Sequence, residues 1–198
     1  MDKKAMTNTK MMNDYCNGIA YASGYFAKED GKQYLVVRNL DSWYVRAIEI
    51  ESRYKAYESK HNIARDGRCQ WVIKARDINN VPILSEIQNV SDFCRAYIEI
   101  HGLLDLSTAK DRNGNYFKKP RLRIYGTERI ISFINAYLPA KEKKIQHISN
   151  VVDNIYIGKT CAIYYQSANE IISIFHWING NPRNERVWAK WKEIIGLE

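Results

Sequence analysis

Cysteine and histidine are scarce in this 198-residue chain, and they are widely spaced. No two of the four cysteines form a C-x-x-C pair, and no two of the four histidines form an H-x-x-x-H pair. Pairs at such spacings are the usual sequence signal of a structural zinc ion, so the sequence predicts no zinc site. We expect free buried thiols rather than a disulfide framework at Cys16, Cys69, Cys94 and Cys161.

Long apolar runs and the common nucleotide-binding and hydrolase motifs are also missing. No stretch approaches the roughly 20 apolar residues needed to cross a bilayer. The start, Met1-Asp2-Lys3-Lys4, leads into polar residues rather than into the apolar region of a signal peptide. We therefore expect a soluble, cytoplasmic protein with no membrane partner. No P-loop, G-x-G-x-x-G or G-x-S-x-G is present to support a nucleotide-dependent enzyme or a hydrolase.

The composition is that of a globular protein, and its charge is strongly basic. Apolar residues make up 45% and charged residues 26%, which argues against a disordered chain. Thirty Lys and Arg against 22 Asp and Glu give a net charge of +8. An excess of this size favours a polyanionic partner, of which nucleic acid is the commonest, over a merely basic surface.

The pattern of predicted elements occurs twice, with a boundary near residue 90. In each half a helix ended by glycine precedes strands, a capped helix and further strands. The predicted helices and strands of the first half are 13–28, 34–38, 43–53 and 69–76. Those of the second half are 93–100, 103–108, 121–125, 129–138, 144–149, 162–166, 169–178 and 184–195. We interpret the chain as an α+β protein with an internal duplication, its halves being 1–90 and 91–198.

One segment of each half resembles a known signature helix. Phe93–Gly102, with the sequence F-C-R-A-Y-I-E-I-H-G, is similar to the signature of LAGLIDADG homing endonucleases, and Ala20–Glu29 is similar to the second copy. The resemblance implies a monomer of two pseudo-symmetric αββαββα halves, whose antiparallel sheets form a saddle over double-stranded DNA. Small side chains, such as that of Ala96, would let the signature helices pack closely.

The same resemblance implies a catalytic acid at the base of each signature helix, where two carboxylates share divalent metal ions. The first position falls on Glu29, or on Asp30 if the register slips by one residue, and a carboxylate there could hold Mg²⁺. The second falls on His101, whose imidazole is a poor ligand for a hard cation. Between Glu29 and the helix at Asp41 there is room for only one strand, so the sheet of the first half is predicted to be shortened.

The resemblance implies that alternating polar residues on the concave face of each sheet contact the DNA. In the first half they are Gln33, Arg38, Gln70, Lys74 and Arg76, and in the second they are Lys118, Lys119, Arg121, Arg123 and Gln166. Ordinary solvated strand faces would show the same alternation.

We interpret the chain as a DNA-binding protein in which cleavage is lost or weakened, so that Mg²⁺ is needed only if cleavage is retained. One alternative is an active metal-dependent endonuclease or nickase that uses Glu29 and His101. The other is a protein-binding regulator or inhibitor of a nucleic-acid machine, which contacts its partner through the saddle or the last helix. The apolar residues of that helix, which could equally pack inside the domain, are Val187, Trp188, Trp191, Ile194 and Ile195.

Overall fold

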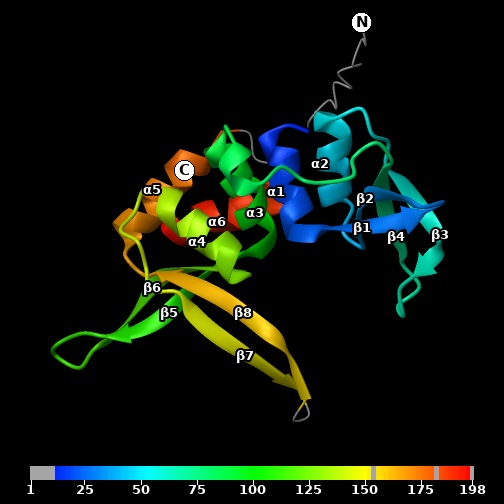
Figure 1. Ribbon diagram of the computed structural model, residues 1–198. Coiled ribbons are helices and arrows are strands. Elements are labelled where there is room, and N and C mark those ends of the chain that lie inside the picture. Colours follow the sequence, from blue (N-terminus) through cyan, green and yellow to red (C-terminus); the bar gives the residue numbers. More distant parts are fainter. Residues whose placement is uncertain (1–11, 153–154, 181–182, 197–198) are drawn as a thin grey trace, which may run out of the picture. The chain divides into compact units, whose positions relative to one another are not determined.

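The computed structural model describes residues 12–152, 155–180 and 183–196. The chain divides into two compact units, Met1–Ile87 and Gln88–Glu198. In each unit, helices cover one face of an antiparallel sheet (Figure 1). Within the described ranges, no helix is both long enough and apolar enough to cross a membrane.

The first unit contains a four-stranded sheet in the order β1-β2-β4-β3, with every neighbouring pair antiparallel. Its elements are α1 (Asp14–Ser23), β1 (Gly24–Glu29), β2 (Lys32–Asn39), α2 (Trp43–Glu51), β3 (Tyr57–Ile63) and β4 (Cys69–Ala75). A short 3-10 turn, Leu84–Glu86, follows β4 at the point where a third helix would be expected.

The second unit repeats this arrangement with longer strands, in the order β5-β6-β8-β7. Its elements are α3 (Val90–His101), β5 (Gly102–Lys110), β6 (Tyr116–Gly126), α4 (Glu128–Tyr137), β7 (Gln146–Val152), β8 (Ile155–Tyr165), α5 (Ala168–Ile178) and α6 (Glu185–Ile195). Both units therefore follow the order helix, two strands, helix, two strands. The predicted α+β class and the two similar halves are confirmed.

Each sheet buries one face under helices, and the other, which helices do not cover, is called here the open face. On the open face of the first sheet, Tyr34, Val36 and Val72 are themselves buried in a small apolar cluster. In β2, Leu35 and Val37 are 2% and 0% exposed and lie on the face that α1 and α2 cover. In β6, Leu122 and Ile124 are likewise buried on the face that α3, α4 and α5 cover. Because side chains alternate along a strand, the residues between these positions lie on the open face.

The last helix, α6, packs inside the second unit. Trp188 and Trp191 are buried, and the Trp188 ring lies 4.4 Å from the ring of Phe175, centroid to centroid. The indole Nε1 of Trp188 donates a hydrogen bond to the buried carboxylate of Glu99 in α3. These two tryptophans therefore stabilise the unit from inside and are not exposed for docking, whereas Val187, Ile194 and Ile195 remain partly exposed.

Candidate nucleic-acid interface

The two signature helices end in the same way, at a glycine that begins the next strand. A Cβ atom added to Gly24 would lie 2.5 Å from the carbonyl oxygen of Ala20, and one added to Gly102 would lie 2.4 Å from that of Ile98. Both glycines have ordinary negative φ angles, so the requirement is for space rather than for an unusual backbone. Only glycine, which has no Cβ, allows the chain to pass this close to the helix carbonyl oxygen as it leaves the helix.

These matching junctions define which residues of the two halves correspond. The residue before Gly24 is Ser23, and the residue before Gly102 is His101. Each is the last residue of its helix, and each is half-buried. The His101 ring lies 5.0 Å from that of Tyr97, one turn earlier in α3. Ser23, rather than Glu29, is therefore the counterpart of His101.

The predicted extent of the first helix is wrong, and the error moved the expected acid position. We expected a helix to Lys28, but α1 ends at Ser23 and the next six residues form β1. Aromatic Tyr25 and Phe26 fit helical spacing, but such residues also favour strands. The first unit thus has a complete β1–β2 hairpin, and the prediction of a shortened sheet is also wrong.

Glu29 and Asp30 lie at the far end of this hairpin. Glu29 is the last residue of β1, about 16 Å along the strand from Gly24 at roughly 3.3 Å per residue. It forms an ion pair with Arg76, whose guanidinium lowers the pKa of the Glu29 carboxyl. Asp30, with φ of 51°, forms the turn with Gly31. Neither carboxylate reaches the end of α1.

The residues at the helix ends do not suit the Mg²⁺ ions that this type of scaffold implies. Mg²⁺ is bound chiefly through carboxylate oxygens and water in nearly octahedral geometry. Ser23 offers a neutral hydroxyl, and His101 offers an imidazole nitrogen. Neither supplies the negative charge that would offset a divalent cation, so these two residues do not make a two-carboxylate metal site.

The open face of the second sheet has a cluster of charged side chains. Arg121 donates two hydrogen bonds of 3.0 Å to the carboxylate of Asp105, and Arg123 donates a third of 2.5 Å. The pKa of Asp105 is lowered, first by the hydrogen bond from Arg121 and then by the charges of both arginines. One carboxylate therefore binds two of the predicted DNA contacts at the same time.

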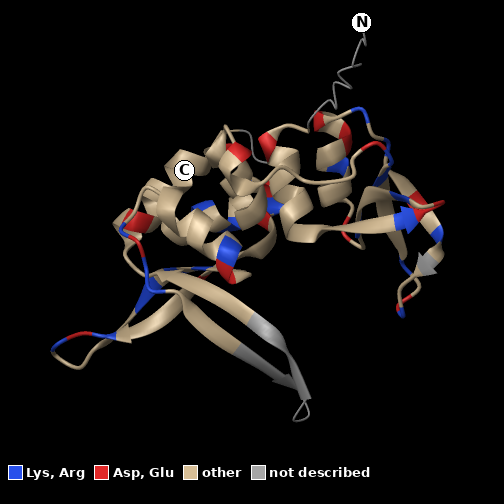
Figure 2. Ribbon diagram, in the orientation of Figure 1, with Lys and Arg blue, Asp and Glu red and all other residues tan. Residues whose placement is uncertain are grey.

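Two further predicted contacts extend this cluster along β6, whose basic residues can be followed in Figure 2. Lys119 Nζ donates to the side-chain oxygen of Gln166, 2.9 Å away, just beyond β8. By strand alternation, Lys119 shares the face of Arg121 and Arg123, whereas Lys118 lies on the opposite face and donates to Thr108. The expectation that all five second-half residues share one face is therefore wrong for Lys118.

The first sheet places four of its five predicted contacts together. Arg38, Gln70, Lys74 and Arg76 lie on the open face, because Val36 is paired with Lys74 and Arg38 with Val72. Gln33 lies on the opposite face, where its side chain donates to the backbone oxygen of Asn79. The assignment of Gln33 to the open face is therefore wrong.

Aromatic residues on this open face were not predicted from the sequence. They line a groove of about 520 Å³ with the basic residues around them. The guanidinium of Arg38 lies 5.0 Å from the centroid of the Tyr25 ring, and that of Arg76 lies 5.3 Å from that of Tyr34. Tyr57 completes the set from β3. The signal for this groove was the alternation of Tyr34 and Arg38 along a single strand.

Comparison with solved structures reveals the fold of the whole chain. A point mutant of I-SmaMI matches 93% of this chain and 90% of its own, with a TM-score of 0.60 and 9% identity. The I-LtrWI LAGLIDADG homing endonuclease bound to target DNA matches 96% and 91%, with a TM-score of 0.59 and 11% identity. No protein-family model and no curated protein matches the sequence. The chain therefore has the fold of LAGLIDADG homing endonucleases.

Proposed function

We propose that this protein binds double-stranded DNA through the open faces of its two sheets and does not cleave it by the two-carboxylate mechanism. The observation that carries the proposal is the pair of helix ends. On a homing-endonuclease fold, Ser23 and His101 occupy the positions at which the resemblance implies acids.

The charge of the open faces supports binding. Arg38, Lys74 and Arg76 in the first unit, with Lys119 and the arginine pair in the second, are side chains able to neutralise phosphates. Guanidinium groups can also donate to guanine edges in the major groove. The I-LtrWI endonuclease, which has a similar fold, is bound to target DNA in its structure. Because this chain has basic strand faces, we propose DNA binding for it as well.

DNA binding is tested by fluorescence anisotropy on a labelled random-sequence duplex over a salt titration. We expect log K to fall linearly with log salt, with a slope of about −0.9 for each phosphate contact. Lys74→Ala and Lys119→Ala should each make that slope shallower by about one unit. Lys190→Ala, which removes an exposed lysine of α6, is the matched control and should leave the slope unchanged.

Cleavage is tested on the same duplex, and on supercoiled plasmid, with Mg²⁺ or Mn²⁺ present. We expect bound DNA with no nicked or linear product. Nicking that persists in Glu29→Gln but is lost in His101→Ala would overturn our account and make the imidazole a working catalytic group. Nicking lost in Glu29→Gln would restore the original assignment of that carboxylate.

The protein-binding alternative is decided by the same titration. If wild-type protein shows no affinity for duplex DNA even at low salt, the proposal fails and the basic faces must serve another partner. If Lys190→Ala weakens binding as much as Lys119→Ala, the affinity comes from overall charge and the open faces are not the interface.

A further inference from the structure

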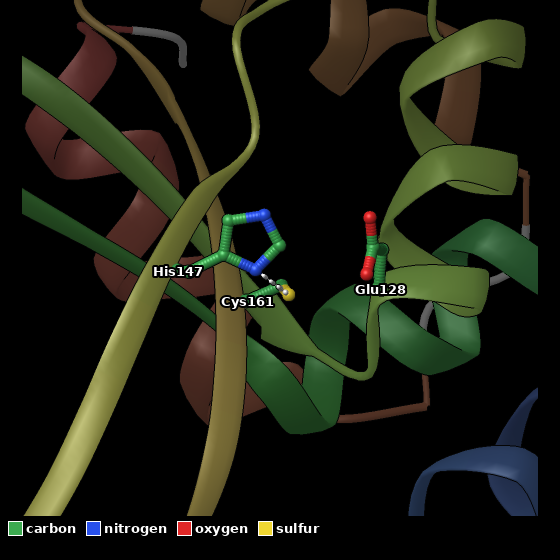
Figure 3. Close-up of side chains that lie close together, drawn as sticks. All are labelled: Glu128, His147 and Cys161. Carbon is green, nitrogen blue, oxygen red and sulfur yellow. Dashed lines mark hydrogen bonds between the residues drawn. The ribbon is translucent and has the colours of Figure 1, made fainter.

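Three side chains that could bind a metal ion converge in the second unit, away from the open face of its sheet. Glu128 is the first residue of α4, His147 lies in β7 and Cys161 lies in β8 (Figure 3). Each residue offers one ligand atom, and these three atoms all lie within 4.8 Å of one another. The thiol Sγ of Cys161 and Nδ1 of His147 are 3.4 Å apart.

We infer that Glu128, His147 and Cys161 form a binding site for one borderline transition-metal ion of the Zn²⁺ type. This inference is independent of the proposed DNA binding. None of the three residues belongs to the open strand faces or to the helix ends before Gly24 and Gly102.

The dimensions of the cluster suit such an ion. Tetrahedral zinc has bonds of about 2.3 Å to sulfur and about 2.0–2.2 Å to nitrogen or oxygen. Two ligand atoms of one ion are then about 3.3–3.6 Å apart. The separation of Cys161 Sγ and His147 Nδ1 already lies in this range. The other two separations both involve Glu128 and are no longer than 4.8 Å, and rotation of its exposed side chain would shorten them.

The backbone holds the ligands in place from two independent directions. His147 and Cys161 are directly paired across β7 and β8, which brings their side chains to the same face of the sheet. Cys161 is only 2% exposed, so its sulfur is fixed by packing. Helix α4 packs against β8 and brings Glu128 to the same place.

The donor types select the class of ion. A thiolate, an imidazole and a carboxylate together favour Zn²⁺ and its neighbours over Mg²⁺ or Ca²⁺, which prefer oxygen ligands alone. Three protein ligands with an exposed side leave a fourth position for water. The charge balance agrees, because one dication would neutralise the carboxylate together with the thiolate that forms when the thiol releases its proton to solvent on binding.

The site would fasten an edge strand. In the sheet order β5-β6-β8-β7, β7 is paired on one side only. An ion shared by His147 and Glu128 would connect β7 to the start of α4, so that the edge strand is held by coordination bonds as well as by its ladder with β8. The expected effect of the ion is therefore to stabilise the edge strand.

Titration of the reduced full chain with Co²⁺, followed by its absorption spectrum, tests the inference. We expect one Co²⁺ per chain, a thiolate-to-cobalt charge-transfer band, intense tetrahedral d–d bands, and displacement by Zn²⁺ but not by millimolar Mg²⁺. Glu128→Gln, His147→Asn and Cys161→Ser should each weaken binding at least about ten-fold. Zn²⁺ should also raise the melting temperature of the wild-type chain.

Cys69→Ser and His61→Asn, which change a free cysteine and a histidine of the first unit, are the matched controls. The inference is overturned if no charge-transfer band forms, or if these controls weaken binding as much as the cluster variants do. The exposed positions Glu128 and His147 keep the test decisive even if Cys161→Ser disturbs the core. If the Glu128 and His147 variants both bind Co²⁺ as tightly as the wild type, the three residues do not form a metal site, and the thiol and imidazole only share a hydrogen bond.

Discussion

Replacement of Asp105 by asparagine is the most direct test of the open face of the second sheet. The carboxylate accepts three hydrogen bonds from Arg121 and Arg123, which are two of the proposed DNA contacts. The asparagine side chain has nearly the same shape but no charge, so the change releases two guanidinium groups and removes one charge that repels phosphate. We expect Asp105→Asn to bind duplex DNA more tightly than the wild type.

The size of the gain follows from Coulomb's law. A unit charge about 6 Å from a phosphate in water contributes about 0.7 kcal/mol, so its removal strengthens binding about three-fold for one nearby phosphate and about ten-fold for two. If the released arginines also reach phosphates, the salt slope steepens by about 0.9 for each. We expect little loss of stability, because Asp105, Arg121 and Arg123 remain 31%, 30% and 21% exposed.

Anisotropy titrations at several salt concentrations measure both effects, and a melting curve checks the fold. Glu142→Gln is the control, because it removes the same charge from an exposed loop after α4. An Asp105→Asn variant that melts like the wild type but binds DNA equally or more weakly would refute the assignment of this face. An equal gain in Glu142→Gln would show that net charge alone is responsible.

Three further predictions concern stability. Gly102→Ala should lower the free energy of unfolding, measured in urea, by about 1–3 kcal/mol, because the new Cβ would lie 2.4 Å from the carbonyl oxygen of Ile98. An unchanged free energy would contradict this close contact. Trp188→Phe should lower the free energy of unfolding by about 1–3 kcal/mol, because the buried carboxylate of Glu99 loses a hydrogen-bond donor. A loss under about 0.5 kcal/mol would show that this hydrogen bond contributes little. Because its folded pKa is lowered, Asp105 should make its small contribution to stability in full above its unfolded pKa of about 3.9 and lose it as pH falls through the folded value. The small difference in stability between wild type and Asp105→Asn should therefore disappear in acid denaturation.

The sequence predicted the duplication and most elements, because apolar periodicity and terminal glycines are local signals. It failed at the end of the first helix, where Tyr25 and Phe26 continue the helical spacing although the chain has already turned into β1. What ends α1 is the approach of the chain at Gly24 to the helix backbone and to Leu35. The approach to Ala20 is local, but Leu35 lies on β2, outside the stretch of sequence from which the helix was predicted.

The candidate sites also divide into features that local sequence signals predict and features that depend on tertiary structure. Alternation along β4 and β6 predicted which basic residues share a face. Gln33 is out of step with Arg38 on β2, and Lys118 is out of step with Lys119 on β6, so alternation itself places both on the opposite face, and their inclusion was wrong. The cluster of Glu128, His147 and Cys161 was missed because its ligands come from α4, β7 and β8. Zinc motifs are recognised by spacing within one segment, and here the spacing is set by strand pairing.

At the two helix ends, the fold requires the glycine, whereas only cleavage requires a carboxylate before it. Glycine at positions 24 and 102 is required by contact distances of 2.5 and 2.4 Å. A carboxylate at the preceding position is not required, and the negative end of the helix dipole disfavours it by about 0.3–1 kcal/mol. We therefore expect Ser23→Asp to lower the free energy of unfolding by about this amount at low ionic strength, and neutral Ser23→Asn to lower it less. If Ser23→Asp were instead as stable as the wild type, stability would not explain why this helix end lacks an acid, and its absence would have to be traced to function alone.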